Sequence, residues 1–473
     1  MLRGYGFKAA LLSAATGVWI ATVPMGAASA QTLEEALVEA YITNPTLLAQ
    51  RAQLRATDEG VPQALAGWRP NVEFTADVNG VRSRLKTSAT RTESTRMTSG
   101  VQLQITQNVY DGGATSAAVE GAKADVLAAR ADLVSTEQSI MLDVGTAYMD
   151  VFKNQAVVSL NEQNVVRLER QLEATRDRYN AGVATLTDVA QAESRLARSR
   201  SDLSSARGDL EVSRTVFEEV VGIPPTNLSL PTLPLTLPAG RDEAKSMAVE
   251  RNPSVVSAEF DRRAALHGID EQEADLLPSV DVSGTASHDW DKSTKGSFQR
   301  TYTVTAQLSV PIYQQGYETS QVRESKMTAA KALQDVETAR RSVTEQALSA
   351  WETYQSVVAA IVAIREEVRA AEIALDGVQQ EELVGQRTVL DVLDAEQELL
   401  DAKVSLVQAE RDETVAKFEL ISAVGGLTAR DLGLDVEAYD PALHYDSVKD
   451  TWWGLGDDVE THDSDAKAAA VQP

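Results

Sequence analysis

The residues best suited to chemistry are charged side chains that flank two matching turns. The string VGQRTVLDVLDAEQE at Val384–Glu398 has a weaker copy, AGVATLTDVAQAE, at Ala181–Glu193. Gly182 aligns with Gly385 at a spacing of 203 residues (385 − 182), and the Thr and Asp residues that follow align at the same spacing. Paired carboxylates are common throughout this acidic chain, so a solvated surface is their default role.

Each string is typical of a tight turn between two helices. A glycine suits the left-handed conformation that ends a helix, and Thr-x-x-Asp before an apolar run is typical of a capping box. In the second copy Thr388 and Asp391 would form that box, whereas Asp394 lies outside it. Two such helical hairpins, half a chain apart, predict an internal duplication.

Catalytic and metal-binding patterns find little support. The four histidines, His267, His288, His444 and His462, are scattered and lack metal-ligand spacing. The sequence has neither a phosphate-binding glycine loop nor a Gly-x-Ser-x-Gly elbow. We therefore predict no enzymatic activity, no cofactor and no metal.

The N-terminal residues are typical of an export signal. Arg3 and Lys8 precede a short apolar stretch, and Ala28-Ser29-Ala30 matches a cleavage site. No later stretch approaches the roughly 18 apolar residues of a membrane helix. Removal of the signal changes the net charge from −26 to −28, because two basic residues and no acidic residues are lost. This charge argues against nucleic acid and anionic lipid surfaces as partners.

Alternating segments follow Pro70 in the first half and Pro278 in the second half. Strict exchange of apolar and polar residues is typical of half-buried strands. The predicted strands are Asn71–Val81, Val101–Val109, Val280–Ala286 and Val304–Val310, with polar loops predicted at Ser83–Thr98 and His288–Phe298. Alternation by itself favours a soluble sheet over a membrane barrel with its apolar side outward.

A helical pattern then runs to each hairpin glycine over about 68 residues, which at 1.5 Å per residue predicts a helix roughly 100 Å long. Apolar residues recur at seven-residue steps, as in Val144, Val151, Val158, Val165 and Leu172. The second copy has two such series, which start at Val336 and Ala347. Sustained heptads predict a supercoil, and two series on one helix predict neighbours on two sides. An ordinary long bundle is the alternative.

The duplication sets the expected domain boundaries. We predict a signal peptide at 1–30, a first repeat at 31–222 (helix, two barrel strands, long helical hairpin), a proline-rich linker at 223–240, a second repeat at 241–430 and an acidic C-terminal tail at 431–473. The tail holds eleven acidic residues and two lysines, and about its last fifteen residues are expected to be disordered. We expect the residues from Gly433 onward to be dispensable for assembly.

The strand number bears on the choice between sheet and barrel. Four strands cannot close a membrane barrel, since the smallest such barrels have eight and open edges are not tolerated in lipid. A membrane barrel would therefore need an oligomer, with the long helices forming a tube in the same symmetry. This arrangement explains the duplication, the paired heptad series and the export signal together, whereas a soluble sheet explains none of them.

From about Gln31 to Leu427 the sequence resembles the TolC-like family of outer-membrane efflux and secretion channels. The matching motifs are the Asn-Pro helix starts, Tyr-Asp-Gly-Gly after the second strand, and Gly-x-Arg-Thr-x-x-Asp-Val-Leu-Asp-Ala at Gly385–Ala395. The resemblance implies a mainly α protein with a membrane β-barrel: a trimeric twelve-stranded barrel, four strands per chain, that continues into a twelve-helix α-barrel. It also implies an outer-membrane location with a long periplasmic extension.

In that family the hairpin ends form the periplasmic entrance, and the resemblance implies roles for residues there. Asp391 and Asp394 match the positions around the narrowest point, so a trimer would place six carboxylates around one axis. The capping box alone is an alternative explanation for Asp391. Arg387 matches a gating arginine, and Thr187 with Asp188 match its partners, which would be held by charge-assisted bonds.

The gating positions depart from the family pattern at one place. Glu382 stands where the best-known member has a gating tyrosine, and a tyrosine occurs in the other hairpin as Tyr179. The bonds that hold the entrance closed, which we call the latch, are therefore expected to be weaker or to involve other residues. A solvated surface position is the alternative for Arg387, since exposed ion pairs contribute only about 0–1 kcal/mol each. The turn residues expected to dock an adaptor are Ala181, Gly182, Val183, Val384, Gly385 and Gln386.

The implied function is a duct that exports secreted proteins or small molecules, as in type I secretion or efflux. Its implied partners are two further copies of the chain, a periplasmic adaptor (membrane fusion) protein, an inner-membrane ABC or proton-driven transporter, and outer-membrane lipid. An exported structural coiled coil without channel activity is the alternative from another class. A periplasmic adaptor is a third reading, which the four strands and the duplication disfavour.

Overall fold

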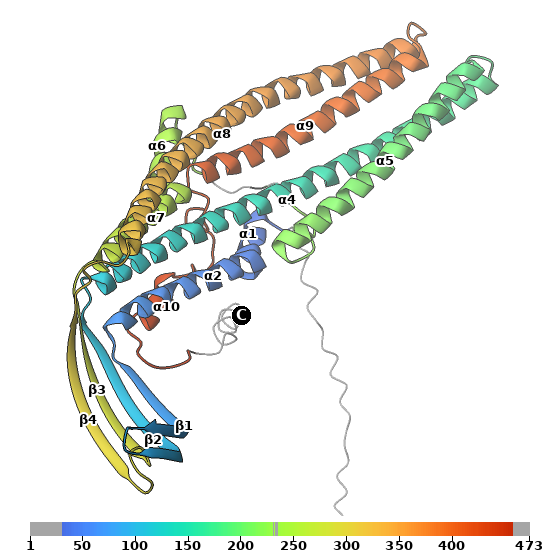
Figure 1. The fold of residues 1–473 in the computed structure, drawn as a ribbon. Helices are drawn as coiled ribbons and strands as arrows, with labels where there is room; N and C mark the ends of the chain where they lie inside the picture. Colours follow the sequence, from blue (N-terminus) through green and yellow to red (C-terminus); the bar gives the residue numbers. More distant parts are fainter. Residues whose placement is uncertain (1–30, 230, 232–234, 457–473) are drawn as a thin grey trace, which may run out of the picture.

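The computed structural model describes residues 31–229, 231 and 235–456. Within them the chain forms two similar halves, each with short helices, an antiparallel strand pair and a long helical hairpin (Figure 1). The sheet lies at one end of the molecule and the hairpin tips at the other. The predicted signal peptide, 1–30, and the last part of the predicted tail, 457–473, lie outside the described residues.

The two halves repeat the same order of elements. The first half comprises α1 (Leu33–Thr43), α2 (Pro45–Asp58), α3 (Gly60–Leu65), the 3-10 helix η1 (Ala66–Trp68), β1 (Asn71–Lys86), β2 (Arg91–Tyr110), α4 (Ala114–Asn180) and α5 (Leu186–Val221). The second half comprises α6 (Arg241–Arg251), α7 (Pro253–Ala274), β3 (Ser279–Trp290), β4 (Phe298–Ser309), α8 (Tyr317–Leu383) and α9 (Val389–Ala423), followed by α10 (Ala442–Val448). Helices α4 and α8 each contain 67 residues, so each spans roughly 100 Å, as predicted.

Each half begins a helix at an Asn-Pro pair, and the asparagine also links that helix to the return helix of its hairpin. The Asn44 side chain accepts two backbone N–H groups of α2 and donates to the Val220 carbonyl at 2.9 Å. The Asn252 side chain repeats this in the second half, where it donates to the Ala423 carbonyl at 3.0 Å. Proline fits the first helical position because the N–H that it lacks would have no partner there.

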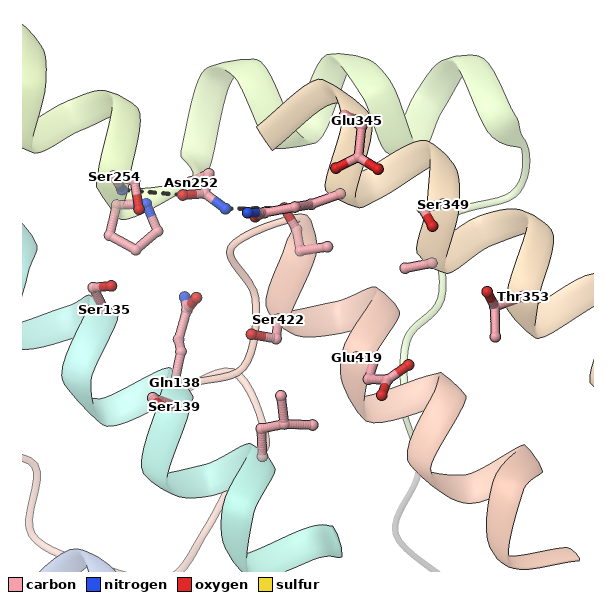
Figure 2. Close-up of a pocket in the computed structure, with 15 residues that line it drawn as sticks. Ser135, Gln138, Ser139, Asn252, Ser254, Glu345, Ser349, Thr353, Glu419 and Ser422 are labelled. Atoms are coloured by element: carbon pink, nitrogen blue, oxygen red, sulfur yellow. Dashed lines mark hydrogen bonds between the residues drawn. The ribbon is translucent and has the colours of Figure 1, made fainter. Parts of the chain in front are cut away.

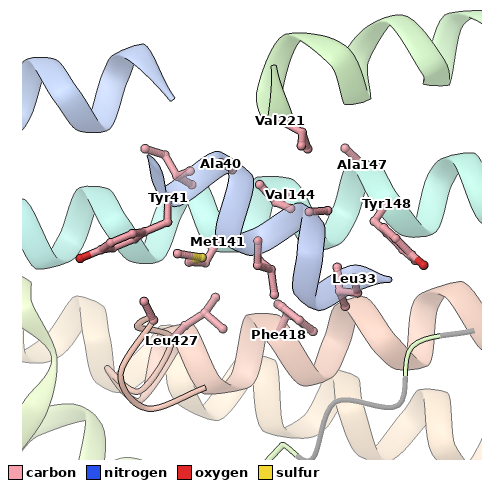
Figure 3. Packing of buried hydrophobic residues seen from close by; sticks show 14 of the residues in the cluster. Leu33, Ala40, Tyr41, Met141, Val144, Ala147, Tyr148, Val221, Phe418 and Leu427 are labelled. Carbon is pink, nitrogen blue, oxygen red and sulfur yellow. The ribbon is translucent and has the colours of Figure 1, made fainter. Parts of the chain in front are cut away.

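The largest buried cluster lies where α1 packs against α4 beside the ends of α5 and α9 (Figure 3). Its labelled members are Leu33, Ala40 and Tyr41 of α1, Met141, Val144, Ala147 and Tyr148 of α4, Val221 of α5, Phe418 of α9, and Leu427. The buried Tyr148 hydroxyl lies 2.9 Å from the Gln31 carbonyl oxygen and accepts the Ser229 N–H at 3.1 Å. The start of the first repeat and the predicted linker therefore both contact this core.

The described part of the predicted tail also packs on the body, whereas the last fifteen or so residues, which we expect to be disordered, lie outside the described residues. Leu434 is buried in the main cluster, and the Tyr439 N–H donates to the Tyr41 hydroxyl at 3.0 Å. In α10, His444 lies 3.1 Å from the buried carboxylate of Asp58. The composition of residues 431–456 is acidic, but their few apolar and aromatic residues provide enough contacts to order this stretch.

Helix α8 carries the two predicted heptad series, and its buried residues follow them. Val322, Ala329, Val336 and Val343 recur at seven-residue steps and are all buried. The helix also contains an 18-residue window of mean hydropathy 1.3, of which 11% is buried within the chain. Length and composition alone would suit a membrane span, which we did not expect from the sequence. Packing against neighbouring helices along both series also explains these apolar positions.

The four strands form one antiparallel sheet in the order β1-β2-β3-β4. Each half contributes two neighbouring strands, and β2 pairs with β3 to join the halves. Strands β1 and β4 are the free edges within the chain. Such edges are not tolerated in lipid, so they require partners from other chains.

The strand register places the predicted apolar residues of all four strands on one face. Phe74 lies opposite Leu103, Leu103 opposite Ala286, and Ala286 opposite Tyr302. This face is uncovered in the single chain, where Phe74 is 67% exposed and Val304 is 83% exposed. We refer to it as the apolar face of the sheet and to the opposite side as the polar face.

The hairpin between β1 and β2 corrects one expectation. Residues 83–98 were predicted to be a polar loop, but β1 continues to Lys86 and β2 begins at Arg91. Threonine favours extended backbone, and charged pairs across the strands support it, with the Arg82 Nε 2.9 Å from the Glu93 carboxylate. The loop between β3 and β4 lies close to its expected place, between Trp290 and Phe298.

Candidate functional site at the hairpin tips

The two hairpin tips have the same backbone construction. Gly182 and Gly385 both adopt a φ of +77°, which glycine enters without the steric cost that a Cβ imposes. Thr185 then caps α5 and Thr388 caps α9, each through a complete capping box. The turns read from the sequence are confirmed, and the 203-residue offset is a structural repeat.

Asp188 and Asp391 are the acidic partners in these capping boxes. The Asp391 carboxylate accepts the Thr388 N–H at 2.8 Å, and the Asp188 carboxylate accepts the Thr185 N–H at 2.8 Å. The hydrogen bonds from Thr388, first its backbone and then its side chain, lower the pKa of Asp391 below its usual value. An exposed Asp391 therefore stays ionised at neutral pH while it also caps α9.

Arg387 pairs within its own hairpin rather than with its predicted partners. Its Nε donates to Glu381 at 2.9 Å, and this hydrogen bond is the main cause that raises the pKa of Arg387. Asp188 is held by the cap of α5 on the other hairpin. Within one chain, the predicted bonds from Arg387 to Thr187 and Asp188 are not formed.

Two other ion pairs join the hairpins near their tips, and a third, between Arg411 of α9 and Asp150 of α4, lies farther from them. Arg178, at the end of α4, pairs with Glu382 at the end of α8. Arg195 of α5 pairs with Asp394 of α9. Glu382 is the more enclosed carboxylate, because its side chain is only 11% exposed. The predicted site residues Glu382 and Asp394 are therefore both contacts between hairpins, whereas Tyr179 is 43% exposed beside them.

Arg178 and Arg195 were not among the predicted site residues, although the duplication contains a signal for both. At the offset of 203, Arg178 aligns with Glu381 and Arg195 aligns with Glu398. Opposite charges at equivalent positions of two adjacent hairpins are well placed for pairing. The observed acidic partners are near these equivalents but not identical to them, and only the structure identifies them.

An apolar cluster supports the ion pairs close to the tips. It comprises Leu168 and Leu172 of α4, Val189, Ala192 and Leu196 of α5, and Leu393 of α9. Beside Leu393 in the chain, Glu396 is buried, and this burial raises its pKa while the nearby Arg167 acts in the opposite direction. One Glu396 carboxylate oxygen has no hydrogen-bond partner in the described part of the chain.

The turns themselves are exposed and partly apolar. All six residues predicted to dock an adaptor are exposed, and Val183 and Val384 are 79% and 70% exposed. Leu186 and Leu383 beside them are 66% and 69% exposed. Exposed apolar side chains at the end of a long hairpin suit contact with another protein.

A polar cavity of about 430 Å³ lies away from the tips, where α7 begins between α4, α8 and α9 (Figure 2). Gln138 reaches toward it from α4, and Glu345 and Glu419 line it from α8 and α9. The described residues include no group of three or more His, Asp or Glu side chains that could hold a metal.

Comparison with known proteins shows which family has this sequence and architecture. A family model described as "Outer membrane efflux protein" matches residues 36–222 and 245–426. The outer membrane efflux protein BepC of Brucella suis is 35% identical over 430 residues, which cover 91% of this chain and 93% of that protein. The outer membrane protein TolC of Vibrio cholerae is 27% identical over 91% of this chain and 96% of that protein. Among solved structures, the outer membrane protein VceC of Vibrio cholerae matches with a TM-score of 0.72 and 20% identity, over 83% of this chain and 96% of that one.

Proposed function

The chain belongs to the outer membrane efflux protein family, and from this premise we propose that it acts as one third of a trimeric export duct whose hairpin tips form a closable periplasmic entrance. It is an outer-membrane channel for efflux or secretion and not an enzyme. Channels of this family are trimeric and work with adaptor and inner-membrane transporter proteins. The alternative of an exported coiled coil without channel activity does not fit this family.

The strand edges support closure between three chains. Four strands per chain leave β1 and β4 unpaired, and pairing β4 of one chain with β1 of the next closes a twelve-stranded barrel. The hairpins α4–α5 and α8–α9 then contribute four helices per chain, or twelve helices in the tube. This arrangement also covers the exposed side of α8, whose buried residues in the single chain follow only part of the heptad pattern.

The observation that carries the entrance proposal is the pair of salt bridges between the hairpins, Arg178–Glu382 and Arg195–Asp394. They lie at the end of the molecule farthest from the sheet. A widening of the tube at this end has to separate one hairpin from the other, and these bonds oppose that separation. Asp391 and Asp394 supply carboxylates to the same end, so the entrance favours cations.

An adaptor protein would open the entrance by binding the exposed turns. The six turn residues named above and the apolar side chains of Leu186 and Leu383 offer such a surface. An inner-membrane ABC or proton-driven transporter would supply the cargo, either a secreted protein or a small molecule. Cargo selection then lies with the transporter, since the duct itself presents a polar strand face and acidic tips.

Single-channel conductance in planar bilayers tests both the channel and the latch. We would compare the wild type with Arg387→Ser and with the double variant Arg178→Ser/Arg195→Ser. We expect small, cation-selective steps for the wild type and larger steps for the double variant, because it removes both ion pairs that join the hairpins near their tips. Arg387→Ser should have a smaller effect, since Arg387 pairs within its own hairpin.

A matched control removes an ion pair within one hairpin. Arg200 pairs with Glu169 between α5 and α4, so Arg200→Ser should leave the conductance unchanged. Wild-type steps that the double variant does not enlarge would keep the channel and eliminate these pairs as its latch. Membrane-inserted protein that conducts in no variant would argue against the duct itself.

A further inference from the structure

Charged residues of the sheet are sorted by face. Direct cross-strand partners share a face, so the register assigns every strand residue to the apolar or the polar face. The apolar face carries the cations Arg82, Arg84, Lys86, Arg91 and Arg300, with Glu93 as its one anion in the strands. The polar face carries the anions Glu73, Asp77, Asp281 and Asp289, with Arg96 as its one cation in the strands.

Four of these cations lie beyond the apolar band of the same face, and Arg300 lies opposite His288 near the end of the shorter hairpin β3–β4. On β1 the apolar residues run from Val72 to Val78 and the cations from Arg82 to Lys86. The helices join the other ends of the strands, so the cations lie near the two strand hairpins (Figure 1). Because the helices extend into the periplasm, these hairpins lie at the outer surface of the membrane. We call these five cations the outer basic rim.

The rim has more positive charge than its own carboxylate can neutralise. Arg82 and Arg84 both contact the single carboxylate of Glu93, with the Arg84 Nη2 3.1 Å from each of its oxygens. Lys86 lies directly opposite Arg91, and like charges in that arrangement destabilise a strand pair. Neither of them forms an ion pair within the part of the chain that the structure describes. A net excess of four positive charges (five minus one) on this face therefore contrasts with a net charge of −26 for the whole chain.

Aromatic residues lie near the hairpin end of β3 and β4, where Trp290 is opposite Ser99 and, through it, level with Val78 at the end of the apolar band. His288 stacks with Phe298 at 5.9 Å and contacts Trp290 edge-on at 4.2 Å between ring centroids. Arg300 donates to His288 at 3.2 Å. Aromatic residues of membrane barrels gather where hydrocarbon meets head groups. The head-group layer of the outer leaflet therefore begins at the level of Val78 and Trp290, and the cations from Arg82 to Lys86 lie farther outward.

We propose that the outer basic rim binds the phosphorylated sugar head groups of an anionic glycolipid in the outer leaflet. The proposal rests on the outer-membrane barrel proposed above and adds a specific lipid contact to it. Guanidinium groups suit this partner because they bind phosphate oxygens in a bidentate manner. The occupant lies on the lipid side, since the same cations share a face with Phe74 and Val304 rather than with the carboxylates of the polar face.

The test measures glycolipid binding to the purified trimer by native mass spectrometry in detergent. The probes are bisphosphorylated lipid A, its enzymatically dephosphorylated form, and phosphatidylglycerol. The variant Arg84→Gln/Lys86→Gln/Arg300→Gln removes three rim cations. Arg96→Gln is the matched control, because it removes one cation from the same level of the sheet but from the opposite face.

We expect the wild type to bind bisphosphorylated lipid A at least tenfold more tightly than either other lipid. The triple variant should lose that preference, since each cation near a charged lipid surface changes the affinity about fivefold. Arg96→Gln should retain it. Equal wild-type binding to all three lipids, or an unchanged preference in the triple variant, would overturn the proposal.

Two further measurements separate the lipid-binding proposal from the export-duct proposal. They are the heat-resistant migration of each trimer in gels and its conductance in planar bilayers. A triple variant that conducts like the wild type but has lost the lipid preference supports the rim and leaves the duct intact. Triple-variant protein that does not assemble would be replaced by Arg84→Lys/Arg300→Lys. These substitutions keep the charge but remove the bidentate geometry. They should lose at least part of the preference for bisphosphorylated lipid A, and an unchanged preference would overturn the proposal.

Discussion

At the scale of single residues, several charged groups near the tips do two things at once. Asp391 caps α9 and adds a negative charge to the entrance, while Asp394 adds a charge and pairs with Arg195 of the other hairpin. A substitution at either position therefore changes local structure as well as the field at the entrance. Glu396 differs from both, because it is buried and its role depends on its protonation.

Glu396 predicts a pH dependence of the contact between hairpins. Burial raises its pKa above the ordinary value of 4.5, so the folded state binds this proton more tightly than the unfolded state does. The stability from this group is fully present below pH 4.5 and is lost as the pH rises through the raised value. In melting experiments followed by circular dichroism, Glu396→Gln should therefore reduce the loss of melting temperature between acidic and neutral pH.

The repeat supplies the control for this measurement. Glu193 is the equivalent residue at the offset of 203, and it forms an exposed ion pair with Arg176. Glu193→Gln should leave the pH dependence as it is in the wild type. If Glu396→Gln and the wild type lose the same melting temperature across this range, burial of Glu396 does not govern the contact.

At the scale of elements, close helix packing depends on particular small residues. A Cβ on Gly145 of α4 would lie 2.9 Å from the Phe418 ring of α9, which is almost fully buried. Gly145→Ala should therefore destabilise the protein by about 1–3 kcal/mol through overpacking. Gly208→Ala in α5 is the matched control, since nothing lies within 4 Å of its added Cβ, and it should stabilise the helix by roughly 0.5–1 kcal/mol.

Denaturation of both alanine variants by guanidinium measures this difference. The two variants are expected to change the free energy of unfolding in opposite directions, so a common loss of helical flexibility cannot produce both results. A Gly145→Ala protein as stable as the wild type would show that Phe418 moves aside without cost.

The C-terminal segment gives a second prediction at this scale. Truncation before Gly433 removes Leu434 from the main cluster and His444 from the buried carboxylate of Asp58. It also removes the carbonyl of Thr451, to which Arg69 donates at 2.7 Å. We therefore expect this truncation to lower the melting temperature of the trimer, in contrast to the dispensable tail expected from composition.

A shorter truncation is the control. Truncation before residue 457 keeps Leu434, His444 and the carbonyl of Thr451, so it should lower the melting temperature less than truncation before Gly433 does. Equal melting temperatures for the two truncated proteins would restore the view of a dispensable tail.

At the scale of the whole molecule, the exposed apolar face of the sheet is compatible with a lipid environment and not with water. Its exposed residues would be an aggregation hazard in water, and no element in the described part of the chain covers them. Pairing between chains provides hydrogen-bond partners for the backbone groups at the edges of β1 and β4. Lipid chains cover the apolar face. The long helices then follow from the same symmetry, because each chain places its two hairpins side by side.

Neighbouring residues of β4 test the direction of the two faces. Val304 belongs to the apolar face and Thr303 to the polar face. In a barrel, Val304→Arg should destabilise insertion by roughly 2–4 kcal/mol near the bilayer centre, whereas Thr303→Arg enters a wet lumen and costs much less. Refolding into vesicles, followed by heat-resistant migration in gels, measures both. Similar losses in the two variants would be inconsistent with a lipid-facing side.

Local signals in the sequence were sufficient for much of the fold. Glycine with Thr-x-x-Asp fixed the hairpin turns, heptads fixed the long helices, and Asn-Pro fixed two helix starts, because each is a short-range preference of the backbone. The resemblance added the family, and the matched region of the chain agrees with it. The prediction ended the first two strands too early, because residues 83–98 were expected to form a loop. This segment is rich in threonine and charged residues, which are also typical of loops, and only the cross-strand pairs show that it is extended.

Only the tertiary structure decided which charged residues meet. Arg387 was selected as the latch from its motif, yet Arg178 and Arg195 make the bonds between hairpins. Such contacts depend on the rotation and register of helices that are far apart in sequence. The same holds for the sheet, since the separation of cations and carboxylates onto opposite faces appears only once the register aligns four strands. Sequence determines local geometry through nearest neighbours, whereas pairing over distance is set by how whole elements pack.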